Sequence, residues 1–169
     1  MVMKSQLQLL VVITSFFFLS CSVENTAPNN DLGNSNGFQF DNIAYVTDSV
    51  YITPENEIIL SSKEISNGMT TNNIDFAHFI TTSSSLSEKS YYTGDGLASC
   101  TALTEGDWTG GTVENGEIIL SDTLVDNGFI RVVYLNRTKK EVHLIFEFER
   151  ADGELVAGSF EGNYTTVTF

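Results

Sequence analysis

Residues 141–150, Glu-Val-His-Leu-Ile-Phe-Glu-Phe-Glu-Arg, alternate between apolar and polar side chains. The apolar positions share one face of an extended chain: Val142, Leu144, Phe146 and Phe148. The opposite face is polar apart from Ile145: Glu141, His143, Glu147 and Glu149. A period of two residues predicts a β-strand that packs one face against a core. Because Asp152-Gly153 follows, we expect a hairpin whose return strand covers about 154–164.

Similar turn signals divide the rest of the chain into short segments. They are Pro54-Glu55-Asn56, Asn67-Gly68, Asn115-Gly116, Asn127-Gly128 and 136–140. This spacing predicts an all-β domain over 38–169, an antiparallel β-sandwich of about eight strands. A closed, lipocalin-like β-barrel is the alternative. Two short segments, 84–90 and 97–103, are predicted as helical turns, and Gly158 and Gly162 predict a bulge or close packing.

One short sequence occurs twice. Glu57-Ile-Ile-Leu-Ser61 returns as Glu117-Ile-Ile-Leu-Ser121, and Asn-Gly pairs follow both copies at the same offset. Coincidence between two ordinary strands is the favoured interpretation, because the flanking residues do not align. A duplicated unit spanning 57–68 and 117–128 is the alternative.

The first twenty residues have the composition of an export signal. Lys4 is the only charge, and residues 7–19 are nearly all apolar. Thirteen helical residues span about 20 Å, whereas a bilayer core requires about 20 apolar residues. The segment therefore predicts a signal peptide rather than a membrane span.

The end of that segment, Phe18-Leu19-Ser20-Cys21, resembles the lipobox of bacterial lipoproteins. The resemblance implies that Cys21 is acylated through its sulfur and becomes the new N-terminus, so that the membrane is the chain's first partner. Residues 22–37 are rich in Asn, Gly and Ser and predict a flexible tether, with an end-to-end distance of roughly 20–25 Å.

Charge and cysteine content restrict the classes of partner. The formal net charge is −14, and removing residues 1–20 makes it one unit more negative. Such a chain should repel nucleic acid and anionic lipid. Calcium binding lacks its Asp-rich loop motif. After Cys21 the chain has one cysteine, Cys100, which cannot form an internal disulfide and which we expect to be buried.

Two stretches of the domain are similar to small lipoproteins common in Bacteroidota. Phe38-Gln-Phe-Asp-Asn-Ile-Ala-Tyr45 resembles their opening strand, and Glu141–Phe169, with Gly158-Ser-Phe-Glu-Gly162, resembles their closing hairpin. The resemblance implies a lipid-anchored all-β domain at the bacterial cell envelope, at the periplasmic or surface face of the outer membrane. It also implies O-glycosylation at Asp-Ser/Thr followed by an apolar residue, which Ser49 and Thr123 match.

Few residues carry recognisable chemistry. His78 and His143 are the only histidines, and they have no cysteine partners at zinc-site spacing. The sequence predicts neither a metal nor a cofactor, and without a nucleophile elbow or a phosphate-binding loop it predicts no enzyme. Trp108 lies in a loop-like stretch, 105–111, and Tyr91 and Tyr92 precede the turn Gly94-Asp95-Gly96. These aromatic rings are the candidate ligand contacts, although a core role for Trp108 is favoured.

These observations leave three hypotheses of function. The first is a non-catalytic, lipid-anchored binding or interaction module, whose partner is a glycan or an envelope protein. The second is a lipocalin-like carrier of a small apolar ligand, which requires a cavity of a few hundred Å³. The third is a hydrolase that uses paired carboxylates such as Glu147 and Glu149, for which the sequence has no positive signal.

Overall fold

The computed structural model describes residues 36–168, and every regular element in this part of the chain is a β-strand. Its strands are β1 (Gly37–Phe40), β2 (Ile43–Val46), β3 (Ser49–Ile52), β4 (Glu57–Ser61), β5 (Thr70–Thr81), β6 (Ser90–Thr93), β7 (Gly96–Thr109), β8 (Thr112–Glu114), β9 (Glu117–Leu120), β10 (Val125–Asn136), β11 (Glu141–Arg150) and β12 (Leu155–Thr166). Among the described residues, no helix is long and apolar enough to span a membrane.

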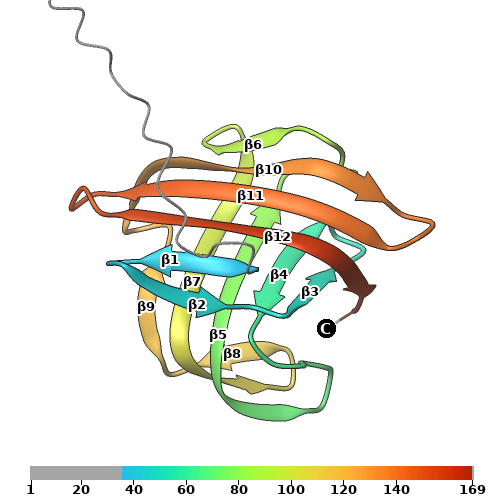
Figure 1. Ribbon diagram of the computed structural model, residues 1–169, viewed down its shortest axis with the longest axis horizontal. Coiled ribbons are helices and arrows are strands. Elements are labelled where there is room, and N and C mark those ends of the chain that lie inside the picture. The colour runs from blue at the N-terminus through green and yellow to red at the C-terminus, as the bar shows by residue number, and fades with distance from the viewer. Residues whose placement is uncertain (1–35, 169) are drawn as a thin grey trace, which may run out of the picture.

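The strands form two antiparallel groups that cross one another. The first group is β10, β11 and β12, with the β1–β2 hairpin paired to the first half of β12. The second group is β3, β4, β5 and β7, and β8 and β9 pair with the distal half of β7. Figure 1 shows β10, β11 and β12, orange to red, running across the strands of the second group.

Two short parallel pairings join these groups at both edges. On one side β12 pairs with β3 over the residue pairs Tyr164–Val50, Thr165–Tyr51 and Thr166–Ile52. On the other side β6 pairs with β10 in an antiparallel manner and with β7 in parallel, the latter over Tyr92–Gly96 and Thr93–Leu97. We call these parallel pairings the β3–β12 seam and the β6–β7 seam.

The seams turn the two groups into a closed barrel. The ring contains eight strands, in the order β3, β4, β5, β7, β6, β10, β11, β12. The expected open sandwich is therefore wrong, and the barrel alternative is confirmed. The reason is physical, because two crossed, twisted sheets approach each other at their corners. There, even two or three residue pairs form hydrogen bonds with backbone N–H and C=O groups that would be unpaired at the edges of a sandwich.

The interior of the barrel is filled by the inward faces of its strands. The strand predicted at 141–150 is β11, and its apolar face is buried as expected. Phe79 lies at the centre, 4.8 Å from the ring of Phe146 and 5.7 Å from the ring of Phe148, to which it is nearly parallel. Alternation on β11 thus supplies two of the three rings in the aromatic cluster that holds the two sheets together.

Two segments outside the eight-stranded ring add side chains to the barrel core. The β1–β2 hairpin buries Phe38, whose ring stacks on Tyr45 at 5.1 Å. The connection between β5 and β6 buries Leu86, whose backbone N–H donates to the side chain of Asn56 at 3.0 Å. Gly158 lies beneath the hairpin, where a Cβ would meet the carbonyl of Gly37 and the ring of Phe146, so the predicted close packing is confirmed.

A second apolar cluster lies on the outer face of β3, β4, β5 and β7. It contains Tyr51, Ile59, Ile65, Ile74, Phe76, Leu103 and Trp108. The connection between β4 and β5 covers part of it, since Ile65 is buried there and its backbone N–H donates to the hydroxyl of Tyr51 at 3.0 Å. At this cluster the sheet is therefore buried on its outer face as well as on its inner face.

Most of the predicted turns are found, and several local predictions are wrong. Pro54-Glu55-Asn56 and Asp152-Gly153 each connect two paired strands. Asn115-Gly116 connects β8 to β9, which both pair with β7. The predicted helical turn at 97–103 belongs to β7, and 84–90 forms bends and the start of β6. β10 begins at Val125, before Asn127-Gly128, and a register shift there accommodates the pair within the strand.

The predictions for the N-terminal segments lie almost wholly outside the described residues. These are the signal peptide at 1–20, the lipid on Cys21 and nearly all of the tether. β1 begins at Gly37, and the side chain of Asn36 both donates to and accepts from the backbone of Glu161. The barrel therefore holds the chain from residue 36 onward.

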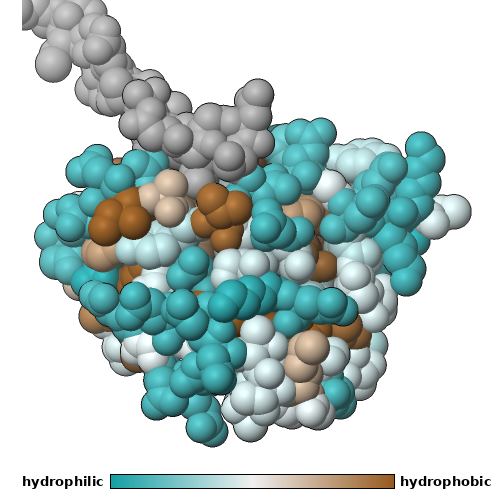
Figure 2. Space-filling model, turned by 60° about the horizontal axis from the view of Figure 1, so that its bottom comes forward, coloured by the Kyte–Doolittle hydropathy of each residue, from teal (hydrophilic) through white to brown (hydrophobic). Residues whose placement is uncertain are grey.

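The surface carries no single large apolar patch on the face shown in Figure 2. Polar residues, in teal, cover most of that face, and hydrophobic residues, in brown, form separate spots. The exposed large apolar side chains of the described residues are dispersed over several strands and loops: Ile43, Val46, Met69, Tyr92, Ile118, Val133, Tyr134 and Leu155. Dispersed apolar residues of this kind are ordinary for a folded domain.

Candidate functional site

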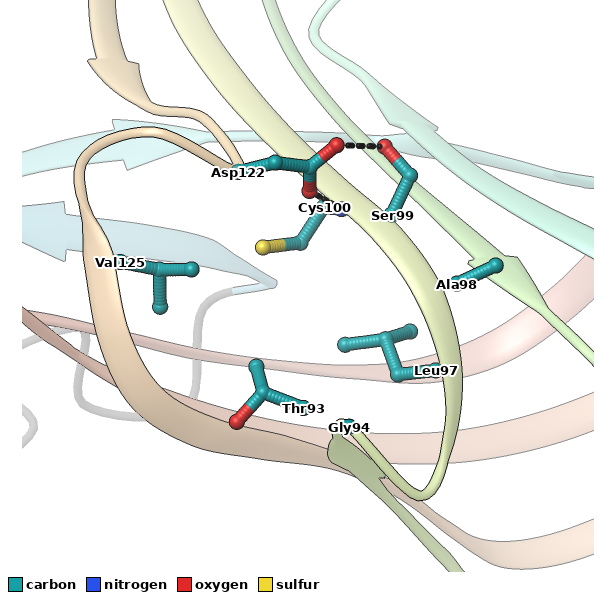
Figure 3. A pocket seen from close by; sticks show the side chains of 8 residues that line it. All are labelled: Thr93, Gly94, Leu97, Ala98, Ser99, Cys100, Asp122 and Val125. Carbon is teal, nitrogen blue, oxygen red and sulfur yellow. Dashed lines mark hydrogen bonds between the residues drawn. The ribbon is translucent and has the colours of Figure 1, made fainter.

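A hollow in the barrel wall is the candidate site, and we call it the lateral pocket. It lies between β7 and β10, beside the β6–β7 seam, and its volume is about 220 Å³. Its lining residues are Thr93, Gly94, Leu97, Ala98, Ser99, Cys100, Asp122 and Val125. Figure 3 shows Leu97, Cys100 and Val125 pointing into the space from opposite sides.

The shortness of the seam explains the pocket. β6 ends at Thr93, and its parallel pairing with β7 covers two residue pairs. Beyond that point β7 and β10 have no strand between them, although both continue. Gly94 and Gly96 make the tight connection with φ angles of 76° and 88°, which other residues rarely adopt. The turn predicted at 94–96 thus forms one edge of the pocket.

The floor of the pocket is apolar. Cys100 is buried, as the sequence predicts, and its neighbour across the sheet is Phe79 of the central aromatic cluster. Leu97 is also buried, and Val125 is half-buried on the opposite strand. A ligand in this space would therefore rest on the outer edge of the barrel core rather than enter its centre.

The rim of the pocket is polar and centred on one carboxylate. Asp122 is exposed, and it accepts hydrogen bonds from the Ser99 hydroxyl and from the Cys100 backbone N–H, both at 2.8 Å. These two bonds fix the carboxylate at the mouth of the pocket. A carboxylate has about four acceptor positions, so Asp122 retains capacity for a ligand donor.

The Cys100 thiol is unsuited to nucleophilic chemistry. Burial, followed by the negative charge and the hydrogen bonding of Asp122, raises the pKa of Cys100 to about 12. The reactive form of cysteine is the thiolate, which is scarce at neutral pH when the pKa is this high. The pocket therefore presents Cys100 as a small apolar surface.

The three predicted aromatic contacts are dispersed rather than gathered at one site. Trp108 lies in β7 rather than in a loop; it is 1% exposed, and its indole N–H donates to the Ser66 carbonyl at 3.0 Å. Tyr91 is fully buried, and its hydroxyl is hydrogen bonded to the backbone of Ser87. Tyr92 is 51% exposed and lies 5.9 Å from the ring of Phe129. Trp108 and Tyr91 thus pack in the fold, and Tyr92 remains available at the surface.

None of the other predicted residues lines the lateral pocket, although Thr123 directly follows Asp122 of its rim. Ser49 opens β3 and is half-buried, whereas Thr123 is exposed and its hydroxyl lies 3.0 Å from that of Ser121. His78 pairs with Glu57 at 3.2 Å on the outside of the barrel, and His143 is half-buried on β11. Among residues 36–168, no three His, Cys, Asp or Glu side chains gather as a metal site.

The sequence contains no pattern that predicts this pocket. Cys100 is correctly predicted to be buried, but Asp122 is 22 residues away, and the sequence pattern that includes it, at Thr123, predicts O-glycosylation rather than a pocket. The pocket arises because β6 is shorter than its neighbours β7 and β10, which is a property of the assembled sheet and not of a local sequence. No protein-family model matches this chain, and no curated protein or solved structure shows significant similarity to it.

Proposed function

We propose that this chain is a lipid-anchored ligand-binding protein of the bacterial cell envelope, which carries a small, mainly apolar ligand in the lateral pocket. The observation that carries the proposal is the closed eight-stranded barrel with a hollow of about 220 Å³ at its weakest seam. An apolar floor and one oriented carboxylate are typical of small-molecule sites. The proposal favours the lipocalin-like interpretation over a general interaction module.

The volume and chemistry of the pocket define the ligand class. A dry apolar cavity of about 150 Å³ in another protein holds benzene, so about 220 Å³ suits one ring or a short alkyl chain. Asp122 favours a ligand whose polar end donates hydrogen bonds, such as an amine or an alcohol. A ligand that ends in a carboxylate is disfavoured by the same charge and by the net charge of −14.

Filling the pocket tests this part of the proposal. We expect Val125→Trp to weaken the binding of hexylamine and hexanol at least about ten-fold, because the indole occupies the ligand's space. Val133→Trp is the matched control, since Val133 lies on the same strand and is exposed. Binding is measured by titration of backbone amide NMR signals. The proposal fails if Val125→Trp binds like the parent, or if hexanoate binds as well as hexylamine.

The anchor is tested separately at Cys21, which lies outside the described residues. Two or more acyl chains hold a protein firmly at a bilayer, since each buried methylene contributes about 0.8 kcal/mol. We expect the full chain to stay with membranes until detergent is added, and Cys21→Ser to appear in the soluble fraction. Mass spectrometry of the mature N-terminus provides the chemical check. A Cys21→Ser protein that still requires detergent would exclude the anchor without affecting the pocket.

A further inference from the structure

A second hollow lies on the outer wall of the barrel, and we call it the outer groove. It is formed where the outward faces of β4, β5 and β7 meet the β7–β8 hairpin, and its volume is about 370 Å³. Thr101, which lines the groove, follows Cys100 of the lateral pocket in β7, and successive side chains of a strand point to opposite faces. From there the groove extends along the strand to Trp108, which is eight residues from Cys100, up to about 26 Å at 3.3 Å per residue.

Strand register explains which side chains reach the groove. Ile59, His78 and Thr101 occupy one row across β4, β5 and β7, since His78 is the register partner of the other two. Phe76 and Leu103 are paired in the next row. The groove therefore has an apolar floor of side chains with little exposure, and Val113 of β8 packs against this cluster and forms a wall.

The rim of the outer groove carries groups that both donate and accept hydrogen bonds. The Nε2 atom of His78 lies 3.2 Å from the Glu57 carboxylate, and both side chains are about one-quarter exposed. Burial lowers the pKa of His78, and the charge and hydrogen bonding of Glu57 oppose this only in part, which favours the neutral imidazole. The hydroxyls of Thr101 and Thr112 complete the rim.

We propose that the outer groove binds a neutral, polyhydroxylated ring, the chemistry of a pyranose sugar. One face of such a ring is made of C–H groups that suit the floor at Phe76 and the wall at Val113. Its hydroxyls both donate and accept, as the rim of Glu57, His78 and Thr101 requires. The Glu57 charge disfavours acidic sugars, and the volume suits a ring or a pair of rings.

The chain contains its own reporter for this site. Trp108 is its only tryptophan, and it lines the outer groove. Its indole N–H therefore gives one resolved NMR signal that is distinct from signals at the lateral pocket. The probes are methyl β-glucopyranoside, methyl β-galactopyranoside and cellobiose. Sorbitol is the control probe because it has hydroxyls but no ring face, and glucuronate is the charge control.

We expect at least one neutral pyranose to shift the Trp108 indole signal and the amide signals of Thr101 and Val113. Dissociation constants on the order of 1–10 mM are typical of ligands this small. Glu57→Gln should weaken binding about ten-fold, because it removes a charged hydrogen-bond acceptor. Thr101→Val is a second, near-isosteric variant and should also weaken binding. Glu117→Gln, at an exposed position of β9, should bind like the parent.

Three results would overturn the proposal. The first is the absence of shifts in these signals with every pyranose, and the second is an equal response to sorbitol or glucuronate. The third is unchanged affinity in both Glu57→Gln and Thr101→Val when circular dichroism shows that both variants are folded. Because Trp108 reports only on the outer groove, failure here leaves the lateral pocket to its own test at Val125.

Discussion

Replacing Phe148 with alanine is expected to lower the free energy of unfolding by about 3–5 kcal/mol, the usual loss for a buried phenylalanine. The side chain is 0% exposed, and its ring is nearly parallel to that of Phe79 at 5.7 Å. It also lies 6.3 Å from Phe146. Removing the ring takes away contacts to both crossed sheets at once, since Phe79 belongs to β5 and Phe148 to β11.

The expected loss is visible in denaturation experiments. A domain of this size should lose roughly 10–20 °C in Tm, and the urea midpoint should fall without a change in slope. Phe129→Ala is the matched control, because Phe129 is half-buried and packs against the exposed Tyr92. Phe129→Ala should lower the free energy of unfolding by less than about 1.5 kcal/mol. Equal losses in the two variants would contradict a close-packed aromatic centre.

The strand that carries Phe148 is also where sequence reasoning was most successful. Residues 141–150 alternate so regularly that the strand and its buried face follow from a two-residue period, and the Asp-Gly pair at 152–153 predicts the turn. The turns at Pro54-Glu55-Asn56 and Asn115-Gly116 are found for a similar reason. Each depends on residues that are neighbours in sequence.

Closure of the barrel is not a local property. The two seams join β12 to β3 and β6 to β7, and each is made of two or three residue pairs. The alternation of apolar and polar residues is the same in a sandwich and in a barrel, because both architectures bury one face of each strand. The contacts that distinguish the two architectures are too few to leave a pattern in the sequence.

Trp108 illustrates a second limit. Its neighbours, Glu105-Gly-Asp-Trp-Thr-Gly-Gly111, have the composition of a loop, yet most of them belong to β7. Glu105 has a φ of 55°, and β7 shifts register against β5 nearby, so the strand bends there. Packing of Trp108 on Phe76, with ring centres 6.2 Å apart, outweighs the local preference for a turn.

The repeated Glu-Ile-Ile-Leu-Ser sequence shows why short similarities mislead. Its first copy is β4, which lies within the barrel ring and is almost entirely buried. Its second copy contains β9, which pairs with β7 outside the ring and exposes Ile118. The two copies are both strands, but their places in the sheet are not equivalent.

Cys100 provides the second large prediction, which concerns its reactivity. We expect folded protein to react with iodoacetamide at pH 8 at least about 100-fold more slowly than unfolded protein. A rise in pKa from 9.0 to about 12 lowers the thiolate fraction about 1000-fold at this pH. The greater nucleophilicity of a more basic thiolate offsets about 20-fold of this, and burial of the sulfur adds a further restriction.

The measurement requires Cys100 to be the only thiol. The Cys21→Ser variant meets this condition, because the chain has two cysteines. Alkylation is followed by mass spectrometry from pH 7 to 11, with and without denaturant. Asp122→Asn is the informative companion variant, since it removes the charge that assists burial in raising the pKa. It should react faster than the parent while leaving the hydrogen-bond geometry largely in place.

The pH dependence of the alkylation rate distinguishes a thiol with a raised pKa from an ordinary thiol that the reagent cannot reach. The folded protein holds its proton more tightly than the unfolded chain between pH 9 and about 12. Its alkylation rate should therefore still rise about ten-fold per pH unit above pH 9, where the unfolded rate becomes constant. The same difference means that this thiol's contribution to stability is complete below pH 9 and is lost as the pH rises through the folded pKa. A folded rate that levels off near pH 9 would show an ordinary thiol behind a steric barrier, and the electrostatic influence of Asp122 on the pocket floor would then be excluded.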